Sequence, residues 1–166
     1  LRLMIDNGLV RIRPKVRSAD IRPCGIRLHL GNQILVPQVT NRAIRISDPA
    51  VEWTSVRIDR SPFVLEPHSF VLGTTRERIE IDAGWVGHLD NRSTCARLGL
   101  VVHGGATTFD SAHSGYRNAV LELGNMGPLR LELRAGDPIV ELQLERLAGR
   151  IQQEPSGQYA GQPGAL

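Results

Sequence analysis

Short segments in which apolar and polar residues alternate dominate this chain. In residues 26–32, IRLHLGN, apolar side chains alternate with Arg27 and His29, as in a strand with one buried face. Gly31 and Asn32 predict a turn at the end of this strand. The period of two therefore begins early in the chain.

Further segments of the same kind follow at short spacing. Proline, glycine and aspartate residues separate them, which is typical of turns between strands. The strands predicted after the first one are residues 33–37, 43–47, 56–59, 63–67, 69–75, 78–82, 98–102, 119–123, 129–133 and 139–147. Because no long helical segments alternate with these strands, the pattern predicts an all-β barrel or sandwich.

The two ends of the chain differ from its middle. Residues 4–8 have the pattern of a helix end that closes at Gly8, and a short extended piece up to Pro14 follows. The segment 152–166 is polar and rich in Gly, Pro and Gln, which predicts a flexible tail in the free protein. We therefore expect one domain, residues 1–151, followed by that C-terminal tail.

The charge of the chain is mildly basic. The 166 residues carry a formal net charge of +3, and Lys15 is the only lysine. Arginine forks match phosphate oxygens in pairs, so the excess fits a phosphorylated ligand, although it also fits a nucleic acid or a simple bias of genome composition. Aromatic residues make up only 4% of the chain and do not interleave with basic runs, so we expect no nucleic-acid partner.

The same composition bears on location and on sulfur chemistry. No apolar run approaches the roughly 18 residues of a membrane span, and no charged-then-apolar N-terminal signal is present. We therefore expect no membrane partner and a cytoplasmic location. Cys24 and Cys95 lie in neither a CxxC motif nor a Cys/His cluster, which predicts free thiols.

Two familiar kinds of catalytic centre find little support in the sequence. Zinc deaminases of nucleotides and bases use H-x-E with P-C-x-x-C, and the chain contains neither motif, so we expect no zinc. Ser93, His103 and Asp110 can be combined on paper into a triad, but no G-x-S-x-G turn supports it. Such trios arise by chance in a chain of this size.

Three glutamates share one local pattern. Glu122, Glu132 and Glu141 each follow an apolar residue in a predicted strand. Alternation places Glu122 on the face opposite Leu121 and Leu123. On pattern alone all three are carboxylates of a solvated face, since glutamate is rarely buried without a partner. Periodicity does not separate them.

The middle of the chain is similar to a known family. Residues 87–110, GHLDNRSTCARLGLVVHGGATTFD, resemble the signature of the dCTP deaminase branch of the dUTPase superfamily. That signature is G-x-x-x-G-R-S-S-x-x-R-x-G-L, then a histidine, then a stretch that ends in an aspartate. Residues 119–127, AVLELGNMG, resemble the catalytic-glutamate strand L-E-x-x-N of the same family. Weaker similarity covers residues 21–32, 63–81, 133–147 and 156–164, so the resemblance extends from about Met4 to Gly164.

This resemblance implies a fold and an assembly. The fold is a distorted dUTPase-like β-barrel of the β-clip or jelly-roll type, with a short N-terminal helix and a C-terminal tail that closes over the active site. The assembly is a homotrimer with its active sites between subunits. The ligand is a pyrimidine deoxynucleoside triphosphate, with Mg²⁺ bound through its phosphates.

The resemblance also implies roles for single residues. Glu122 is the expected general base and acid, and Ser93 and Arg97 are expected to help organise the catalytic water. Asp110 is expected to bind the 3'-hydroxyl of the deoxyribose. The full set of expected nucleotide-binding residues is Arg92, Ser93, Thr94, Arg97, Ala106, Asp110, Val120, Leu121, Gln158 and Gln162.

The chain departs from the family pattern beside this predicted site. Asn91 stands where the family has glycine, and Thr94 where it has a second serine. The connection from Asp110 to Glu122 is two residues longer than usual, which leaves the position of Arg117, and of Tyr116 before it, open.

Four functions follow as hypotheses. The leading one is zinc-independent hydrolytic deamination of dCTP to dUTP and ammonia. The second is a bifunctional enzyme that also cleaves dUTP to dUMP and pyrophosphate, which Asp110 motivates. The third is a nucleotide-binding protein on the same barrel without catalysis, which the insertion motivates. The fourth is deamination of a modified pyrimidine nucleotide.

Overall fold

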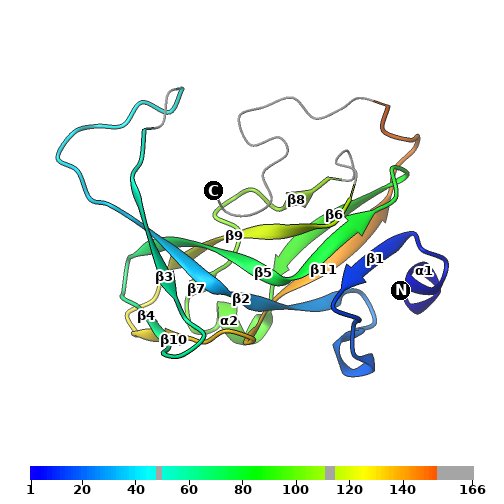
Figure 1. The fold of residues 1–166 in the computed structure, drawn as a ribbon, viewed down its shortest axis with the longest axis horizontal. Helices are drawn as coiled ribbons and strands as arrows, with labels where there is room; N and C mark the ends of the chain where they lie inside the picture. Colours follow the sequence, from blue (N-terminus) through cyan, green and yellow to red (C-terminus); the bar gives the residue numbers. More distant parts are fainter. Residues whose placement is uncertain (48–49, 111–114, 153–166) are drawn as a thin grey trace.

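The structure, a computed structural model, describes residues 1–47, 50–110 and 115–152. Strands make up most of it, and they curl into a partial barrel with only short helices around it (Figure 1). The helical segments are α1 Arg2–Asp6, the 3-10 helix η1 Ser18–Asp20 and α2 Ser93–Ala96. The strands are β1 Val10–Arg13, β2 Ile26–Pro37, β3 Trp53–Arg57, β4 Phe63–Leu65, β5 Phe70–Ile81, β6 Trp85–Asn91, β7 Leu100–Val101, β8 Thr108–Phe109, β9 Arg117–Asn125, β10 Leu131–Leu133 and β11 Pro138–Arg146. The predicted all-β fold is confirmed.

One large antiparallel sheet contains nine of these strands. Its order is β7-β9-β5-β2-β11-β6-β8, with β1 paired to β5 and β3 paired to β2. The strands β4 and β10 form a separate two-stranded sheet. The long strands β2 and β5 lie at the centre, and the short strands β7 and β8 lie at the two ends of the path.

The core forms from one face of the long strands. The largest fully buried side chains of these strands are Ile26, Leu28, Leu30 and Ile34 of β2, Val71 and Ile79 of β5, Leu121 and Leu123 of β9, and Ile139 and Leu142 of β11. Burying one such side chain contributes roughly 1.5–3 kcal/mol. On β9 the alternation is as predicted, because Leu121 and Leu123 are buried and Glu122 between them is only half-buried.

The turn predicted at Gly31 and Asn32 is wrong, because β2 continues through both residues to Pro37. The pairing of β2 with β5 shifts register between Leu30 and Ile34 instead. A Cβ added at Gly31 would lie 3.0 Å from the carbonyl oxygen of Thr74 on β5. The glycine therefore permits a close approach of two strands at a bulge rather than a reversal of the chain.

Other strand boundaries also differ from the predictions. Residues 43–47 form no strand, and the predicted pair 69–75 and 78–82 is one continuous strand, β5. Of residues 98–102 only Leu100 and Val101 are β7. The pattern does not predict β6, because a glycine occupies a core position there: a Cβ at Gly87 would lie 2.8 Å from Leu142.

A buried polar cluster joins η1, β2 and β5. The Nδ1 atom of His29 lies 2.8 Å from Glu77 Oε1, and the backbone N–H of His29 donates to Glu77 Oε2 at 2.8 Å. Arg17 donates to Asp20 through Nε at 2.6 Å. Burial raises the pKa of Asp20, but the hydrogen bond from Arg17 and the charges of His29 and Arg27 together hold this pKa below its ordinary value. The cluster satisfies polar groups that would otherwise be costly to bury.

None of the helices in the described part of the chain is both long and apolar enough to cross a membrane.

Candidate active site

The segment that contains the predicted phosphate-binding residues is a closed loop between β6 and β7. Asn91 closes its base, because its Nδ2 donates to the carbonyl of Leu100 at 2.8 Å and its Oδ1 accepts from the N–H of Val102 at 3.0 Å. Within this loop residues 93–96 form α2, a single helical turn with Arg92 as its N-cap. The asparagine thus does more here than a glycine could, since both contacts need its side chain.

The predicted donors of this loop differ in exposure. Ser93, Thr94 and Arg97 are exposed, and each presents hydrogen-bond donors to solvent. Arg92 is half-buried, and its Nη1 donates to the carbonyl of Pro138 on β11. Arg92 therefore ties α2 to the barrel while the other three remain available to a ligand.

Close packing of two glycines fixes this loop against the end of β9. Gly99 has φ +85, and a Cβ there would lie 2.5 Å from the backbone nitrogen of Gly127. The N–H of Met126 donates to the carbonyl of Gly99 at 2.8 Å. Asn125, which is buried, accepts from the N–H of Gly127 at 3.1 Å and shapes the turn. The loop and β9 therefore behave as one unit.

Glu122 lies on the polar face of β9, beside the chain that leaves β7. Its backbone N–H donates to the carbonyl of Val102 at 3.1 Å, and residues 103 and 122 form a parallel bridge. Gly104 follows with φ +33, and a Cβ there would lie 2.5 Å from Glu122 Oε2. The carboxyl group therefore rests against the backbone of residue 104, in space that only glycine leaves open.

The turn after Gly104 brings two more predicted residues to this point. The N–H of Ala106 donates to the carbonyl of His103 at 2.7 Å, and the side chain of Ala106 is exposed. The Nδ1 atom of His103 is buried, and none of the described residues bonds to it. This unsatisfied nitrogen, in a residue whose backbone pairs with that of Glu122, is visible only in three dimensions.

Asp110 lies directly after β8, at the far end of the same connection. Arg117, the first residue of β9, donates through Nη2 to the carbonyl oxygen of Asp110 at 2.5 Å and to its Oδ1 at 3.2 Å. The strand then presents Val120, which is exposed, and Leu121, whose side chain is fully buried. Only the main chain of Leu121 is therefore in a position to touch a ligand. Gln158 and Gln162 lie outside the described residues.

A shallow apolar groove of about 490 Å³ lies beside α2. Arg92 and Cys95 line it from the α2 side, and Leu131 and Leu133 line it from β10. The apolar side chain of Leu98 at its edge is half-exposed. The groove is therefore a solvent-exposed apolar surface next to the exposed donors of α2.

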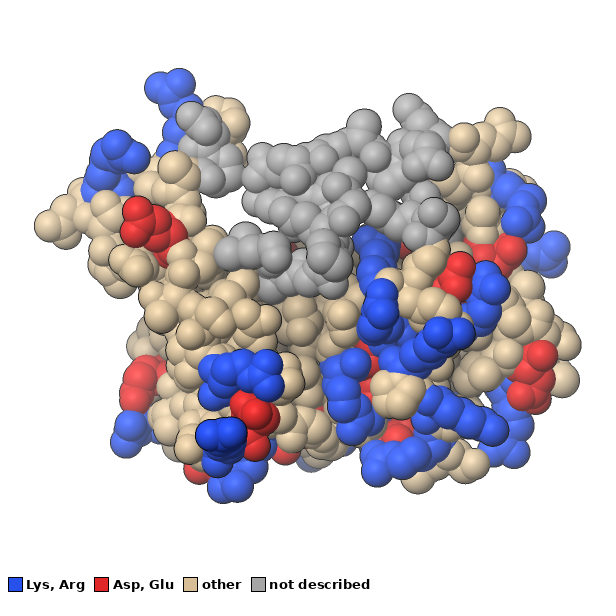
Figure 2. Space-filling view, viewed as in Figure 1, with Lys and Arg blue, Asp and Glu red and all other residues tan. Residues whose placement is uncertain are grey.

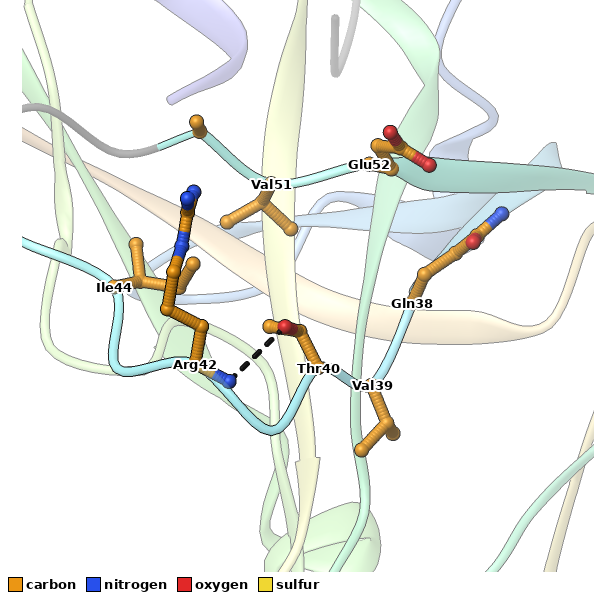
Figure 3. A pocket seen from close by; sticks show the side chains of 8 residues that line it. Gln38, Val39, Thr40, Arg42, Ile44, Val51 and Glu52 are labelled. Atoms are coloured by element: carbon orange, nitrogen blue, oxygen red, sulfur yellow. Dashed lines mark hydrogen bonds between the residues drawn. The ribbon is translucent and has the colours of Figure 1, made fainter.

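A second pocket, of about 410 Å³, lies in the connection between β2 and β3 and contains none of the predicted site residues (Figure 3). Figure 3 shows Arg42, whose backbone N–H donates to Thr40 Oγ1 at 3.1 Å, beside Ile44 and Val51. This connection extends away from the barrel in Figure 1. It is not the candidate site.

The predicted residues fall into two groups within one chain. Group one, on α2, consists of Arg92, Ser93, Thr94 and Arg97; group two, around β8 and β9, consists of Ala106, Asp110, Val120, Leu121 and Glu122. Figure 1 shows α2 near the bottom of the barrel and β8, an edge strand of the large sheet, near its top. The paired strands β7 and β9 connect the two groups, but α2 and the end of β8, where Asp110 follows, lie apart within one chain.

The described side chains offer no ready metal site. Among residues 1–47, 50–110 and 115–152, no group of three or more His, Cys, Asp or Glu is arranged to hold a metal ion. The exposed groups of α2 are hydrogen-bond donors, which suit phosphate oxygens rather than a cation.

Comparisons with known proteins agree on one family. The profile of the dCTP deaminase-like family matches residues 1–147. The dCTP deaminase of Natronomonas pharaonis is 33% identical over 99% of this chain and 88% of its own length. That of Shewanella amazonensis is 36% identical over 89% of this chain and 80% of its own length.

Solved structures support the fold alone. The 2'-deoxycytidine 5'-triphosphate deaminase of Agrobacterium tumefaciens superposes with a TM-score of 0.65 at 14% identity, over 87% of this chain and 46% of that one. This chain therefore spans about half the length of that protein. The dUTPase of Streptococcus mutans superposes with a TM-score of 0.53 at 14% identity, over 86% of this chain and 98% of that one.

Proposed function

Because the chain belongs to the dCTP deaminase-like family, we propose that it hydrolyses dCTP to dUTP and ammonia without zinc. The observation that carries the proposal is the position of Glu122. Its carboxyl group lies on the polar face of β9, against Gly104 and next to the turn of His103 and Ala106. The chain thus holds one acid–base group beside main-chain donors and acceptors that can contact a base.

The reaction needs proton transfers that one carboxyl group can perform. Water attacks C4 of the cytosine ring, and Glu122 takes a proton from that water. Glu122 delivers this proton to N3 of the ring. It then carries the proton of the new C4 hydroxyl group to the amine, which leaves as ammonia while the C4 carbonyl forms. The C4–N4 bond breaks, a C4–O bond remains, and the base becomes uracil. No net oxidation occurs, and the carboxyl group returns to its starting state.

The triphosphate is the proposed ligand of the exposed donors of α2. Ser93 and Arg97 supply a hydroxyl and a guanidinium group from one rigid helical turn, and Thr94 adds a second hydroxyl. Mg²⁺ would be held by phosphate oxygens of the nucleotide, where it offsets their negative charge. Gln158 and Gln162 of the tail are proposed to close over the phosphates.

We infer that the complete site forms between subunits of a homotrimer. The α2 donors of one copy would meet the Glu122 and Asp110 region of another, which explains why α2 and the end of β8 lie apart within one chain. The apolar groove beside α2, with the half-exposed Leu98 at its edge, is the surface proposed to pack against the neighbouring copy. Buried apolar area of this kind favours a stable assembly.

Mixing two inactive variants tests this assembly. Arg97→Ala and Glu122→Gln, each alone, are expected to lose deamination. When the two are unfolded together and refolded as mixed trimers, some interfaces receive both native residues, so part of the activity should return. Separately refolded variants mixed afterwards serve as the control. No recovery in mixed trimers of confirmed composition would place both residues in one subunit's site.

A second candidate function is a bifunctional enzyme that continues from dUTP to dUMP and pyrophosphate. It is supported by Asp110, which directly follows β8 and keeps a half-exposed carboxylate. The family resemblance implies that an aspartate at this position also supports phosphate hydrolysis in enzymes that cleave the triphosphate.

One experiment separates these functions. Purified protein is incubated with Mg²⁺ and either dCTP or dUTP, and the products are resolved by ion-exchange chromatography. Appearance of dUTP alone supports the deaminase, whereas dUMP formed from dCTP supports the bifunctional enzyme. Tight binding of dCTP with no product from either nucleotide would reject both in favour of a binding protein.

A further inference from the structure

We propose that Arg117 is the positioning residue that holds Asp110 in its nucleotide-binding orientation and thereby determines recognition of the 3'-hydroxyl group. This inference rests on the proposed function and on the role that the family resemblance implies for Asp110, which is to bind the 3'-hydroxyl of the deoxyribose. It concerns a residue that the family resemblance leaves without an assigned position.

The contacts of Arg117 fix both the backbone and the side chain of one residue. Its Nη2 atom lies 2.5 Å from the carbonyl oxygen of Asp110 and 3.2 Å from Oδ1 of the same residue. One guanidinium nitrogen therefore contacts both the main chain, where it leaves β8, and the carboxylate of Asp110. The planar group that carries this nitrogen can also stack on an aromatic ring, which the compact ammonium group of lysine does not reproduce.

The guanidinium group is itself held in place. Its Cζ lies 4.2 Å from the centroid of the Phe109 ring, and Phe109 is buried. Burial lowers the pKa of Arg117, while the charge of Asp110 partly opposes this effect. Arginine remains protonated at neutral pH. A cation between an aromatic face and a carboxylate has little freedom to move, which is what a positioning group requires.

The start of β9 is fixed from its other side as well. The Cζ atom of Arg13 in β1 lies 4.3 Å from the centroid of the Tyr116 ring. The Nη2 atom of Arg78 in β5 donates to the carbonyl oxygen of Tyr116 at 2.8 Å. Figure 2 shows the densest group of Lys and Arg on the half of the molecule that contains β1. Tyr116 and Arg117 thus enter β9 at a defined position, whatever the length of the connection before them.

These contacts give the longer connection a physical consequence. The connection from Asp110 to Glu122, which is two residues longer than in the family pattern, starts at Asp110 and contains Arg117. Because Arg117 bonds directly to Asp110, the extra residues need not displace the carboxylate. The positive charge of Arg117 also offsets the negative charge of Asp110, which would lie beside a ligand with several negative charges. A carboxylate has about four acceptor sites, so it can still accept from a sugar hydroxyl.

Kinetics with two nucleotides test this role. Arg117→Gln removes the charge and the fork, and dCTP is compared with 2',3'-dideoxycytidine 5'-triphosphate, which lacks the 3'-hydroxyl. We expect KM for dCTP to rise about tenfold with kcat within about twofold, because a charge-assisted hydrogen bond to the sugar is weakened. KM for the dideoxy analogue should change less than about twofold. Arg117→Lys should fall between the wild type and Arg117→Gln.

Arg57→Gln is the matched control, since Arg57 also pairs with an aspartate, Asp59, on an exposed part of the molecule. Equal changes for both nucleotides would show a merely structural role and overturn the inference, as would no change for dCTP. If Arg117→Gln does not fold, Arg117→Lys alone must show the difference between the nucleotides.

The outcome is separable from that of the proposed function. Should the wild type bind dCTP without deaminating it, the deaminase is rejected, and equilibrium dissociation constants replace KM in the same comparison. If the wild type neither deaminates nor binds dCTP, both proposals fall.

Discussion

Two strands of this protein share the sequence Leu-Glu-Leu and differ in almost everything else. In β9 the glutamate is Glu122, and in β10 it is Glu132. The strand β9 pairs with β5 on one side and β7 on the other, whereas among the described strands β10 pairs with β4 alone. Glu132 is exposed and accepts from Arg134 Nε at 2.6 Å, while Glu122 rests against the backbone of Gly104.

The difference shows what a local pattern leaves out. Alternation correctly places both carboxylates on the face opposite the core. Alternation carries no information about the segment of the protein that lies beside the strand. That segment decides the chemistry of the carboxylate. The exposed carboxylate of Glu132 forms a surface ion pair, which is worth little. In the described part of the chain Glu122 has no ion-pair partner, and the turn at residues 103–106 lies beside it.

The largest expected effect separates the two glutamates by activity. Glu122→Gln should lower the rate of ammonia release from dCTP by about 10³-fold or more, because the proton carrier is lost while the shape is kept. Nucleotide binding, measured by calorimetry, should persist. Glu132→Gln is the matched control and should keep wild-type activity. Full activity of Glu122→Gln would remove this residue from the mechanism.

The next largest effect compares the apolar neighbours of the two glutamates. Leu121→Ala in β9 should lower the free energy of unfolding by about 3–5 kcal/mol, because Leu121 is fully buried within the large sheet. Leu131→Ala in β10 should cost less, about 2–3 kcal/mol, since Leu131 retains 8% exposure in a two-stranded sheet. Urea unfolding at one fixed protein concentration measures both. Equal losses would show that both strands belong to one equally packed core.

A smaller effect concerns the space that Glu122 occupies. Gly104→Ala should reduce kcat about tenfold, because the added Cβ would lie 2.5 Å from Glu122 Oε2 and displace it. It should also cost about 1–2 kcal/mol of stability through its positive φ. Gly136, near β10, has φ +86, and a methyl group added there would meet only open space.

Gly136→Ala should therefore show the stability loss without the loss of kcat. Steady-state kinetics and thermal unfolding of both variants separate the two effects. If both variants lose activity equally, backbone strain rather than displacement of Glu122 is responsible.

The smallest effect is expected at the exposed pair. Glu132→Ala removes the partner of Arg134, and the free energy of unfolding should change by less than about 0.5 kcal/mol. That small change should shrink further at about 1 M salt, where exposed charges are screened. A loss above about 2 kcal/mol would mean that β10 depends on this pair.

Prediction from sequence succeeds where local chemistry dominates. The all-β class follows from the period of two, and the faces of β9 follow from alternation. Prediction from sequence fails where a glycine allows two strands to approach each other closely. Glycine favours turns, so the pattern predicts one at Gly31, yet this residue lies within β2 at a bulge against β5. The pattern misses β6 for the same reason. Gly87 occupies a core position in this strand, and the core side chains of other strands fill the space beside it.

The candidate site divides in the same way. Resemblance in sequence singles out Glu122 among three similar glutamates, and it marks the α2 donors. It gives no position to Arg117 and no reason for Asn91. Both act through contacts across the chain, Arg117 with Asp110 and Asn91 with the strand β7.

The sequence by itself determined the class of the fold, the polar face of β9 and the residue types available for the chemistry, because these depend on neighbours along the chain. Only the tertiary structure decided which carboxylate meets the turn at His103, how Asp110 is held across a lengthened connection, and that α2 and the end of β8 lie apart within one chain. Those features depend on strand pairing between distant segments, and pairing is selected by the packing of the whole barrel rather than by any local pattern.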